Sequence, residues 1–134
     1  MVIGGEGTAE TEVFDPDLNL WRQGPAMNAI RAVPSAVVLP SGHVVACGGA
    51  DRFWRINSKA EVLDPATGAW TEIQPMAEPR LAHTISVLHD GSIVVTGGTA
   101  AVLEEPYHGV ATAERFLNPA QAAPTRAASG RLLP

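Results

Sequence analysis

The sequence predicts an all-β protein built from repeated antiparallel strands. Three observations lead to this prediction: segments 49 residues apart repeat one another, turn sequences recur at matching places, and the stretches between the turns are rich in β-branched and aliphatic residues. The chain of 134 residues is long enough to bury a sizeable core. Its 13 glycines and 11 prolines are typical of a chain interrupted by many turns.

The composition narrows the class of protein. Hydrophobic residues make up 46% and charged residues 17%, which favours a globular domain over a disordered chain. The net charge is −5 and the nine basic residues are scattered, so nucleic-acid binding is disfavoured. No apolar run approaches the roughly 20 residues of a membrane helix. The start, "MVIGGEGTAE", lacks the pattern of a signal peptide. We expect a soluble chain without membrane contact, and the sequence predicts no compartment.

The repeat is clearest when residues 12–31 are aligned with residues 61–80. The two segments read "EVFDPDLNLWRQGPAMNAIR" and "EVLDPATGAWTEIQPMAEPR". Residues 31–49 then match residues 80–98 without a gap. The recurring positions comprise a glycine pair, a glutamate, a tryptophan and an arginine. They are Gly4, Gly5, Gly48, Gly49, Gly97 and Gly98, then Glu12, Glu61 and Glu114, then Trp21 and Trp70, then Arg31 and Arg80. Recurrence at one spacing indicates a structural repeat.

Each unit is expected to form four strands. The first strand is "VPSAVVL" or "AHTISVL", and it meets a tight turn that contains Gly42 or Gly91. The return strand is "HVVACGG" or "SIVVTGG", and the third strand is "AEVLDP". An Asp-Pro turn follows, in which Gly68 and Asn19 hold the same place. Glycine and asparagine best tolerate the left-handed region that such a turn requires. The fourth strand begins at the tryptophan, and four antiparallel strands per unit are typical of a propeller blade.

The repeat that these motifs define resembles the kelch repeat. The resemblance implies a partial β-propeller of four-stranded antiparallel blades. Residues 28–76 resemble a complete blade, residues 1–27 and 77–119 resemble partial blades, and residues 120–134 are expected to be a flexible tail. The pattern departs at Leu63 and Leu117, where an aromatic residue often stands, and at Pro124, where the next tryptophan should fall.

About two and a half blades form an open arc, whereas a closed propeller needs about four to eight blades. We therefore expect a piece of a larger propeller, a truncated product, or a protomer that closes a ring by self-association.

One class of loop varies in length. From the second glycine of each pair to the next recurring glutamate, the interval is 7, 12 and 16 residues in successive units. Insertions confined to one loop class lie on one face of a propeller, and that face is often the binding face. By resemblance, kelch proteins also use this loop and the loop that joins successive blades. The candidate ligand-binding residues are Asp51, Arg52, Phe53, Trp54, Arg55, Glu104, Glu105, Tyr107 and His108. The alternative is that Phe53 and Trp54 fold back over the blade edge.

Structural roles are favoured for the recurring residues. Trp21 and Trp70 are expected to pack between blades. The glycine pairs are expected where backbones approach closely, and not as a phosphate loop. The recurring glutamates are expected to pair with the arginines between blades and not to act as an acid–base couple. No histidine stands at a position that the repeat relates to Cys47, so a small buried residue is favoured over a nucleophile.

Three function hypotheses follow. The first is a non-enzymatic module that recognises a protein or a glycan through the loops after the glycine pairs. The second is a fragment of a kelch-containing enzyme similar to galactose oxidase, whose copper centre looks like two tyrosines, two histidines and a cysteine-linked tyrosine; this chain has one tyrosine. The third is a purely structural arc. The histidines show no metal-ligand spacing, so we predict the first, with no catalytic residues, metal or cofactor.

Overall fold

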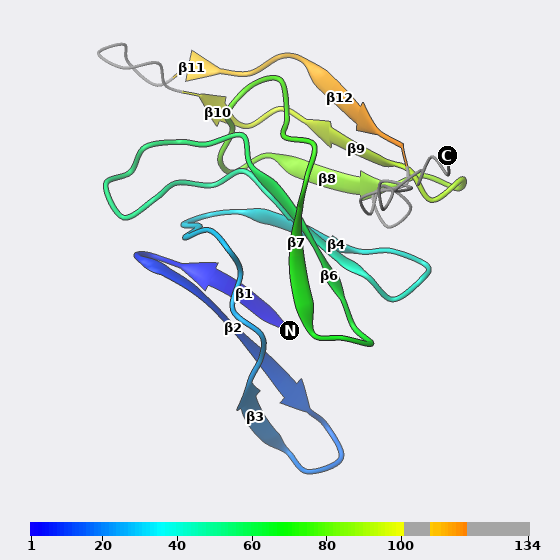
Figure 1. Cartoon of the computed structure of the whole chain (residues 1–134). Coiled ribbons are helices and arrows are strands. Elements are labelled where there is room, and N and C mark those ends of the chain that lie inside the picture. Colours follow the sequence, from blue (N-terminus) through cyan, green and yellow to red (C-terminus); the bar gives the residue numbers. More distant parts are fainter. Residues whose placement is uncertain (101–107, 118–134) are drawn as a thin grey trace, which may run out of the picture.

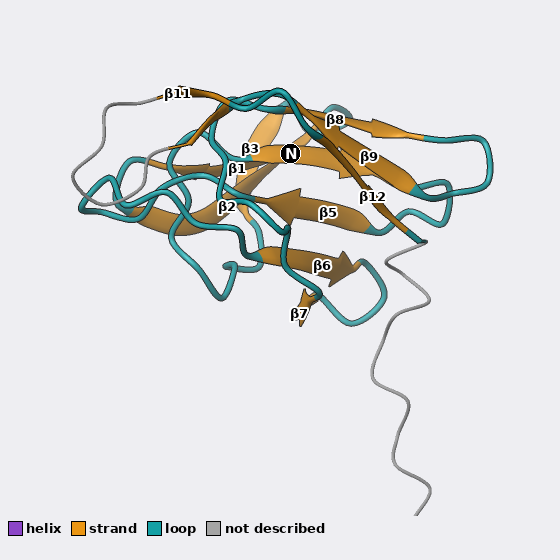
Figure 2. Ribbon diagram, turned by 90° about the horizontal axis from the view of Figure 1, so that it is seen from above, coloured by secondary structure: helices purple, strands orange, loops and turns teal. Residues whose placement is uncertain are grey.

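The computed structural model describes residues 1–100 and 108–117 (Figure 1). All elements of this part of the chain are strands, joined by turns and loops (Figure 2). This confirms the predicted all-β class, and the antiparallel sheets of three and four strands agree with the predicted partial propeller. No helix in the described residues is long and apolar enough to span a bilayer.

Three antiparallel sheets follow one another along the chain. The first has the order β1-β2-β3, from β1 (Val2–Gly5), β2 (Thr8–Asp15) and β3 (Leu20–Gln23). The second has the order β4-β5-β6-β7, from β4 (Ser35–Val38), β5 (Val44–Cys47), β6 (Ala60–Asp64) and β7 (Ala69–Ile73). The third has the order β12-β9-β8, from β8 (Thr84–Val87), β9 (Ile93–Thr96) and β12 (Ala113–Phe116). We call them sheets one, two and three.

The longest loop contains structure that the repeat did not predict. β10 (Thr99–Ala100) pairs with β11 (His108–Gly109) in a separate two-stranded ladder. Without these two short strands, sheet three has the strand order of the first three strands of sheet two. The expected tail, 120–134, lies outside the described residues.

The two central strands of sheet two, β5 and β6, are buried on both faces, and their side chains alternate between those faces. Ala46, Leu63 and Trp70 pack with Met27, and Ile3 and Ala9 of sheet one lie against this cluster. The opposite face carries Leu39, Val45 and Val62, which pack with Ile93 of sheet three. The core therefore lies between successive sheets, as expected for units that bury their apolar faces against neighbours.

The predicted turns have the predicted backbone. Gly42 and Gly91 have φ of 86° and 78°, and Gly68 and Asn19 have φ of 69° and 52°. Each pair stands at one position of the repeat. The repeat also has a positive φ at a position where the residue types do not predict one. Val33 and Ala82 hold this position, with φ of 49° and 50°.

The glycine pairs lie where backbones approach closely, as predicted. A Cβ placed on Gly4 or Gly48 would lie 2.4 Å from the carbonyl oxygen of Arg31 or Arg80, respectively. The next glycine of each pair, Gly5 or Gly49, donates its N–H to that same carbonyl, at 2.9 and 2.8 Å. Each pair therefore binds the backbone of the next unit. Gly97 has φ of 67°, but a Cβ placed on it would lie 3.9 Å from the nearest atom, the carbonyl oxygen of Val110.

Candidate functional site

The loops after the glycine pairs gather at one end of the molecule. Figure 1 shows the β1–β2 turn, the β5–β6 loop and the β10–β11 pair at the left-hand end, opposite the β4–β5 and β8–β9 hairpin turns. This arrangement agrees with the prediction that the length differences fall on one face.

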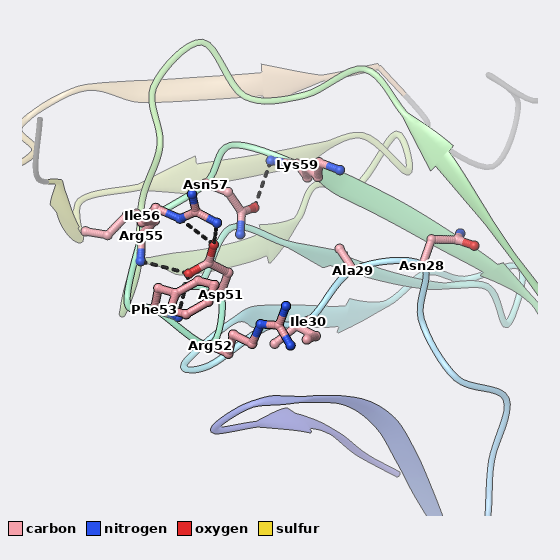
Figure 3. A pocket seen from close by; sticks show the side chains of 10 residues that line it. All are labelled: Asn28, Ala29, Ile30, Asp51, Arg52, Phe53, Arg55, Ile56, Asn57 and Lys59. Atoms are coloured by element: carbon pink, nitrogen blue, oxygen red, sulfur yellow. Dashed lines mark hydrogen bonds and ion pairs between the residues drawn. The ribbon is translucent and has the colours of Figure 1, made fainter. Parts of the chain in front are cut away.

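Two chain segments form a pocket of about 500 Å³ at this end (Figure 3). Residues 51–59 of the β5–β6 loop supply most of the lining, and residues 28–30, which join sheet one to sheet two, supply the rest. The candidate residues that line it are Asp51, Arg52, Phe53 and Arg55. Trp54 does not line it.

Asp51 holds the β5–β6 loop in its shape. Its Oδ1 accepts the backbone N–H of Phe53 at 2.8 Å and that of Arg55 at 3.1 Å. Its Oδ2 accepts Nε of Arg55 at 2.7 Å and lies 2.6 Å from Nη2. The hydrogen bond from Arg55 is the main cause that lowers the pKa of the Asp51 carboxyl, so it is charged at neutral pH. The carbonyl of Asp51 also accepts the N–H of Trp54, whose φ is 59°.

Phe53 stands outward between two guanidinium groups. Its side chain is 65% exposed, and the Cζ atoms of Arg52 and Arg55 lie 5.0 and 5.2 Å from the ring centroid. These distances allow cation–π attraction. Trp54 is 45% exposed. Both aromatic side chains are therefore exposed, which favours the binding interpretation over the alternative that they cover the blade edge.

The base of the loop is tied to the core of sheet two. The N–H of Asn57 donates to the carbonyl of Gly49 at 2.9 Å, and its Oδ1 accepts the N–H of Lys59 at 3.1 Å. Nη1 of the buried Arg31 reaches the same Oδ1 at 3.3 Å. These hydrogen bonds fix the base of the loop that carries the exposed residues Arg52 and Phe53.

Arg31 and Glu61 pair as predicted, although within one sheet unit and not between blades. Both side chains are fully buried, and Nη2 of Arg31 lies 2.8 Å from Oε1 of Glu61. Nη1 of Arg31 also donates to the carbonyls of Gly48 and Lys59, each at 2.8 Å. Glu61 accepts the backbone N–H of Asn28 at 2.7 Å, which fixes the joining loop at the pocket. The acid–base alternative is disfavoured because both groups are buried in a hydrogen-bonded network.

The third unit repeats this arrangement. Arg80 donates to the carbonyls of Gly97 and Thr112 at 2.9 Å and pairs with Glu114 at 3.1 Å. Glu12, by contrast, is exposed and makes no ion pair within the described residues.

The two tryptophans differ. Trp70 is 8% exposed, and its Nε1–H donates to the carbonyl of Pro25 in the joining segment at 2.9 Å, so packing between units is confirmed there. Trp21 is 55% exposed and contacts Phe14, at 5.2 Å between ring centroids. The prediction was wrong for Trp21, because in the described residues no unit lies against that side of sheet one.

A histidine lies beside Cys47, although the repeat related none to that position. Nε2 of His83 is 3.3 Å from Sγ of Cys47, and both side chains are buried. Burial raises the pKa of the Cys47 thiol to about 12 and lowers the pKa of His83 to about 4. Both groups are therefore neutral at neutral pH, so they form no activated thiolate–imidazolium pair. The small buried residue remains the favoured interpretation.

The second candidate loop is described in part. Glu104, Glu105 and Tyr107 lie outside the described residues. His108 is exposed and lines a smaller pocket of about 280 Å³, with Glu78 and Pro79 of the next joining loop. Glu78 and Pro79 stand one repeat after Ala29 and Ile30, so the two pockets occupy equivalent places in successive units. The described residues hold no group of three His, Cys, Asp or Glu side chains placed to share a metal ion.

Residues 28–30, Ile56 and Lys59 line the first pocket but were not among the candidate residues, although the resemblance pointed to the loop that joins successive blades. The available signal was their place in the repeat. Residues 28–30 directly precede the recurring Arg31, and Ile56 and Lys59 lie shortly before the recurring Glu61.

Comparison with protein families agrees with the geometry. Residues 31–77 match the family model described as the Kelch motif. This segment of the chain therefore carries a kelch motif. The match begins at Arg31 and covers sheet two with its glycine pair, glutamate and tryptophan. No curated protein matches the chain. A kelch motif is in general a binding motif and not a catalytic one, which agrees with a propeller-type interaction module.

Proposed function

We propose that this chain is a non-enzymatic recognition module that binds a segment of a partner protein at the pocket between residues 28–30 and 51–59. The observation that carries the proposal is Phe53: a large aromatic side chain, held outward between two arginines by a hydrogen-bonded loop. Aromatic and arginine side chains supply most of the energy at protein interfaces. A loop already fixed before binding loses little conformational entropy when the partner docks.

The charges of the pocket favour a partner segment that carries carboxylates. Arg55 is paired with Asp51, and Lys59 lies 3.6 Å from Glu72. Arg52 has no ion pair within the described residues, although the chain as a whole carries a charge of −5. A local cation on an acidic protein directs an acidic segment to this site and away from the rest of the molecule.

Selection from a displayed random peptide library tests the proposal. Selected peptides should bind the Phe53→Ala and Arg52→Ala variants at least about tenfold more weakly, which is the loss expected for an interface residue of this type. The folded state of both variants should be unchanged, because exposed substitutions alter stability by less than about 0.5 kcal/mol.

Leu18→Ala provides the matched control, since Leu18 is 55% exposed in the β2–β3 turn, away from the pocket. Peptides that bind wild type and Phe53→Ala equally would overturn the proposal. A glycan array probed with the same variants distinguishes the second ligand class: glycans that bind in a Phe53-dependent manner, with no peptide selected, would replace a protein ligand by a glycan.

A further inference from the structure

The two loop pockets described above share a wall. The carbonyl of Asn57, which lines the first pocket, accepts the backbone N–H of Arg80 at 3.3 Å, two residues after Glu78 of the second pocket. The carbonyl of Ser58 likewise accepts the N–H of Met76 at 2.9 Å. The β5–β6 loop therefore lies against the joining loop of the next unit, and one bound segment can contact both pockets.

Glu78 supplies a carboxylate that the repeat itself does not need. The middle unit has Ala29 at this position, and there a single glutamate neutralises the buried Arg31. In the next unit, Arg80 pairs with Glu114 at 3.1 Å and also with Glu78 at 3.3 Å. Because two carboxylates face one guanidinium, this group keeps one uncompensated negative charge.

The uncompensated charge faces solvent at the second pocket. The side chain of Glu78 is 47% exposed, against 18% for Glu114 and 0% for Arg80. Oε2 of Glu78 accepts the hydroxyl of Thr112 at 2.9 Å, which fixes the carboxylate at the pocket. Its Oε1 accepts no hydrogen bond within residues 1–100 and 108–117. This oxygen is therefore open to a donor from a ligand.

The first pocket has the opposite charge. Arg55 and Lys59 line it but each has a carboxylate partner, whereas Arg52 has none within the described residues. An uncompensated cation in one pocket and an uncompensated anion in its neighbour form a dipolar surface. Such a surface favours a ligand that carries both charges and disfavours a ligand of a single sign.

We propose that one segment of the partner protein occupies both pockets, with an acidic side chain at Arg52 and a basic side chain at Glu78. A lysine or arginine of the ligand donates to Oε1 of Glu78, and hydrogen bonds between charged groups are stronger than neutral ones. The proposal rests on the proposed function, because the acidic side chain docks in the pocket that carries Phe53.

A double-mutant cycle tests the proposal. A peptide selected on the wild-type chain is synthesised as selected and with its basic residues replaced by glutamine, and fluorescence anisotropy measures the affinity of both. Glu78→Ala should bind the selected peptide at least about fivefold more weakly than wild type does. The glutamine peptide should bind wild type and Glu78→Ala equally, because the coupling between the two charges is already lost.

Two further variants serve as controls. Asp17→Ala also removes an exposed carboxylate, but in the β2–β3 turn away from both pockets, so it should leave both affinities unchanged. Glu78→Ala should fold, because Glu114 still neutralises Arg80 as one glutamate does in the middle unit, and circular dichroism checks this. Glu78→Gln keeps an acceptor for Thr112 and should give the same loss of affinity if the alanine variant is unstable.

The proposal is overturned if the selected peptides carry no basic residue. It is also overturned if both Glu78 variants bind them as tightly as wild type, or if the glutamine peptide loses affinity for Glu78→Ala as well. In each of these cases, binding that is still weakened by Phe53→Ala leaves the proposed function intact. If no selected peptide depends on Phe53, the proposed function and this proposal are both wrong.

Discussion

At the residue scale, the buried Arg31–Glu61 pair organises the middle unit. The guanidinium joins the glycine pair of β5, the residue before β6 and the carboxylate of Glu61. That carboxylate in turn holds the backbone of the joining loop at Asn28 and Ala29. One pair therefore connects the frame of the sheet with the rim of the pocket.

Removing the charge of Glu61 should be strongly destabilising. Glu61→Gln keeps the volume of the side chain but leaves a fully buried guanidinium without its counter-ion, and such a loss costs about 3–5 kcal/mol. Urea denaturation measures the free energy of unfolding. The control is Arg22→Gln in the exposed Arg22–Asp15 pair, at 3.2 Å, which should cost less than about 1 kcal/mol. Equal effects of the two changes would contradict the account.

Pairing of recurring arginines with recurring glutamates was predictable from the sequence, because charged residues that repeat once per unit need partners if they are buried. The neighbourhood of Cys47 was not predictable. His83 reaches it across the junction of two units, 36 residues away. A contact of this kind depends on how sheets stack, and a repeat pattern shows only which residues are equivalent.

At the element scale, the turns and strand ends follow from residue types where glycine or asparagine supplies the left-handed backbone. Gly68 and Asn19 were predictable for this reason. The positive φ of Val33 and Ala82 was not predictable. Valine and alanine are rare at positive φ, so their presence gives no sign of the turn that both units share. The β10–β11 ladder was also not predictable, since two-residue strands carry no periodic pattern.

Two glycines of the middle unit should respond differently to alanine. At Gly68, with φ of 69°, nothing lies within 4 Å of an added Cβ, so Gly68→Ala should cost only the backbone strain, about 1 kcal/mol. At Gly48 an added Cβ would lie 2.4 Å from the carbonyl of Arg80, so the next unit must move away. Gly48→Ala should therefore destabilise the protein several-fold more, as measured by thermal unfolding. Similar losses at both positions would show that the glycine pair does not join the units.

At the scale of the whole molecule, the units are stabilised by stacking, and the outermost unit shows what an unstacked face looks like. Trp70 is 8% exposed because sheet one covers it, whereas its repeat equivalent Trp21 is 55% exposed beside the 39% exposed Phe14. An apolar groove lies between sheets one and two, lined by Ile3 and by Val38 and Val44. The pocket at Phe53 is a different kind of surface, carried by a loop that the core of sheet two holds in place.

The general architecture was predictable from the sequence because the repeat fixes the number and order of strands in each unit. The composition of the pocket was predictable only in part. The length differences located the β5–β6 loop, but the contribution of residues 28–30 depends on how Glu61 holds the joining loop against the sheet.

The mass of the purified chain in solution, measured by light scattering after size exclusion, tests the central claim that these units are stabilised by stacking. Between about 10 µM and about 1 mM, the account predicts an apparent mass that rises above that of one chain, because the exposed face of sheet one associates by mass action. A mass equal to one chain at every concentration would contradict it, since the exposed face around Trp21 would then be stable in water without a neighbouring unit.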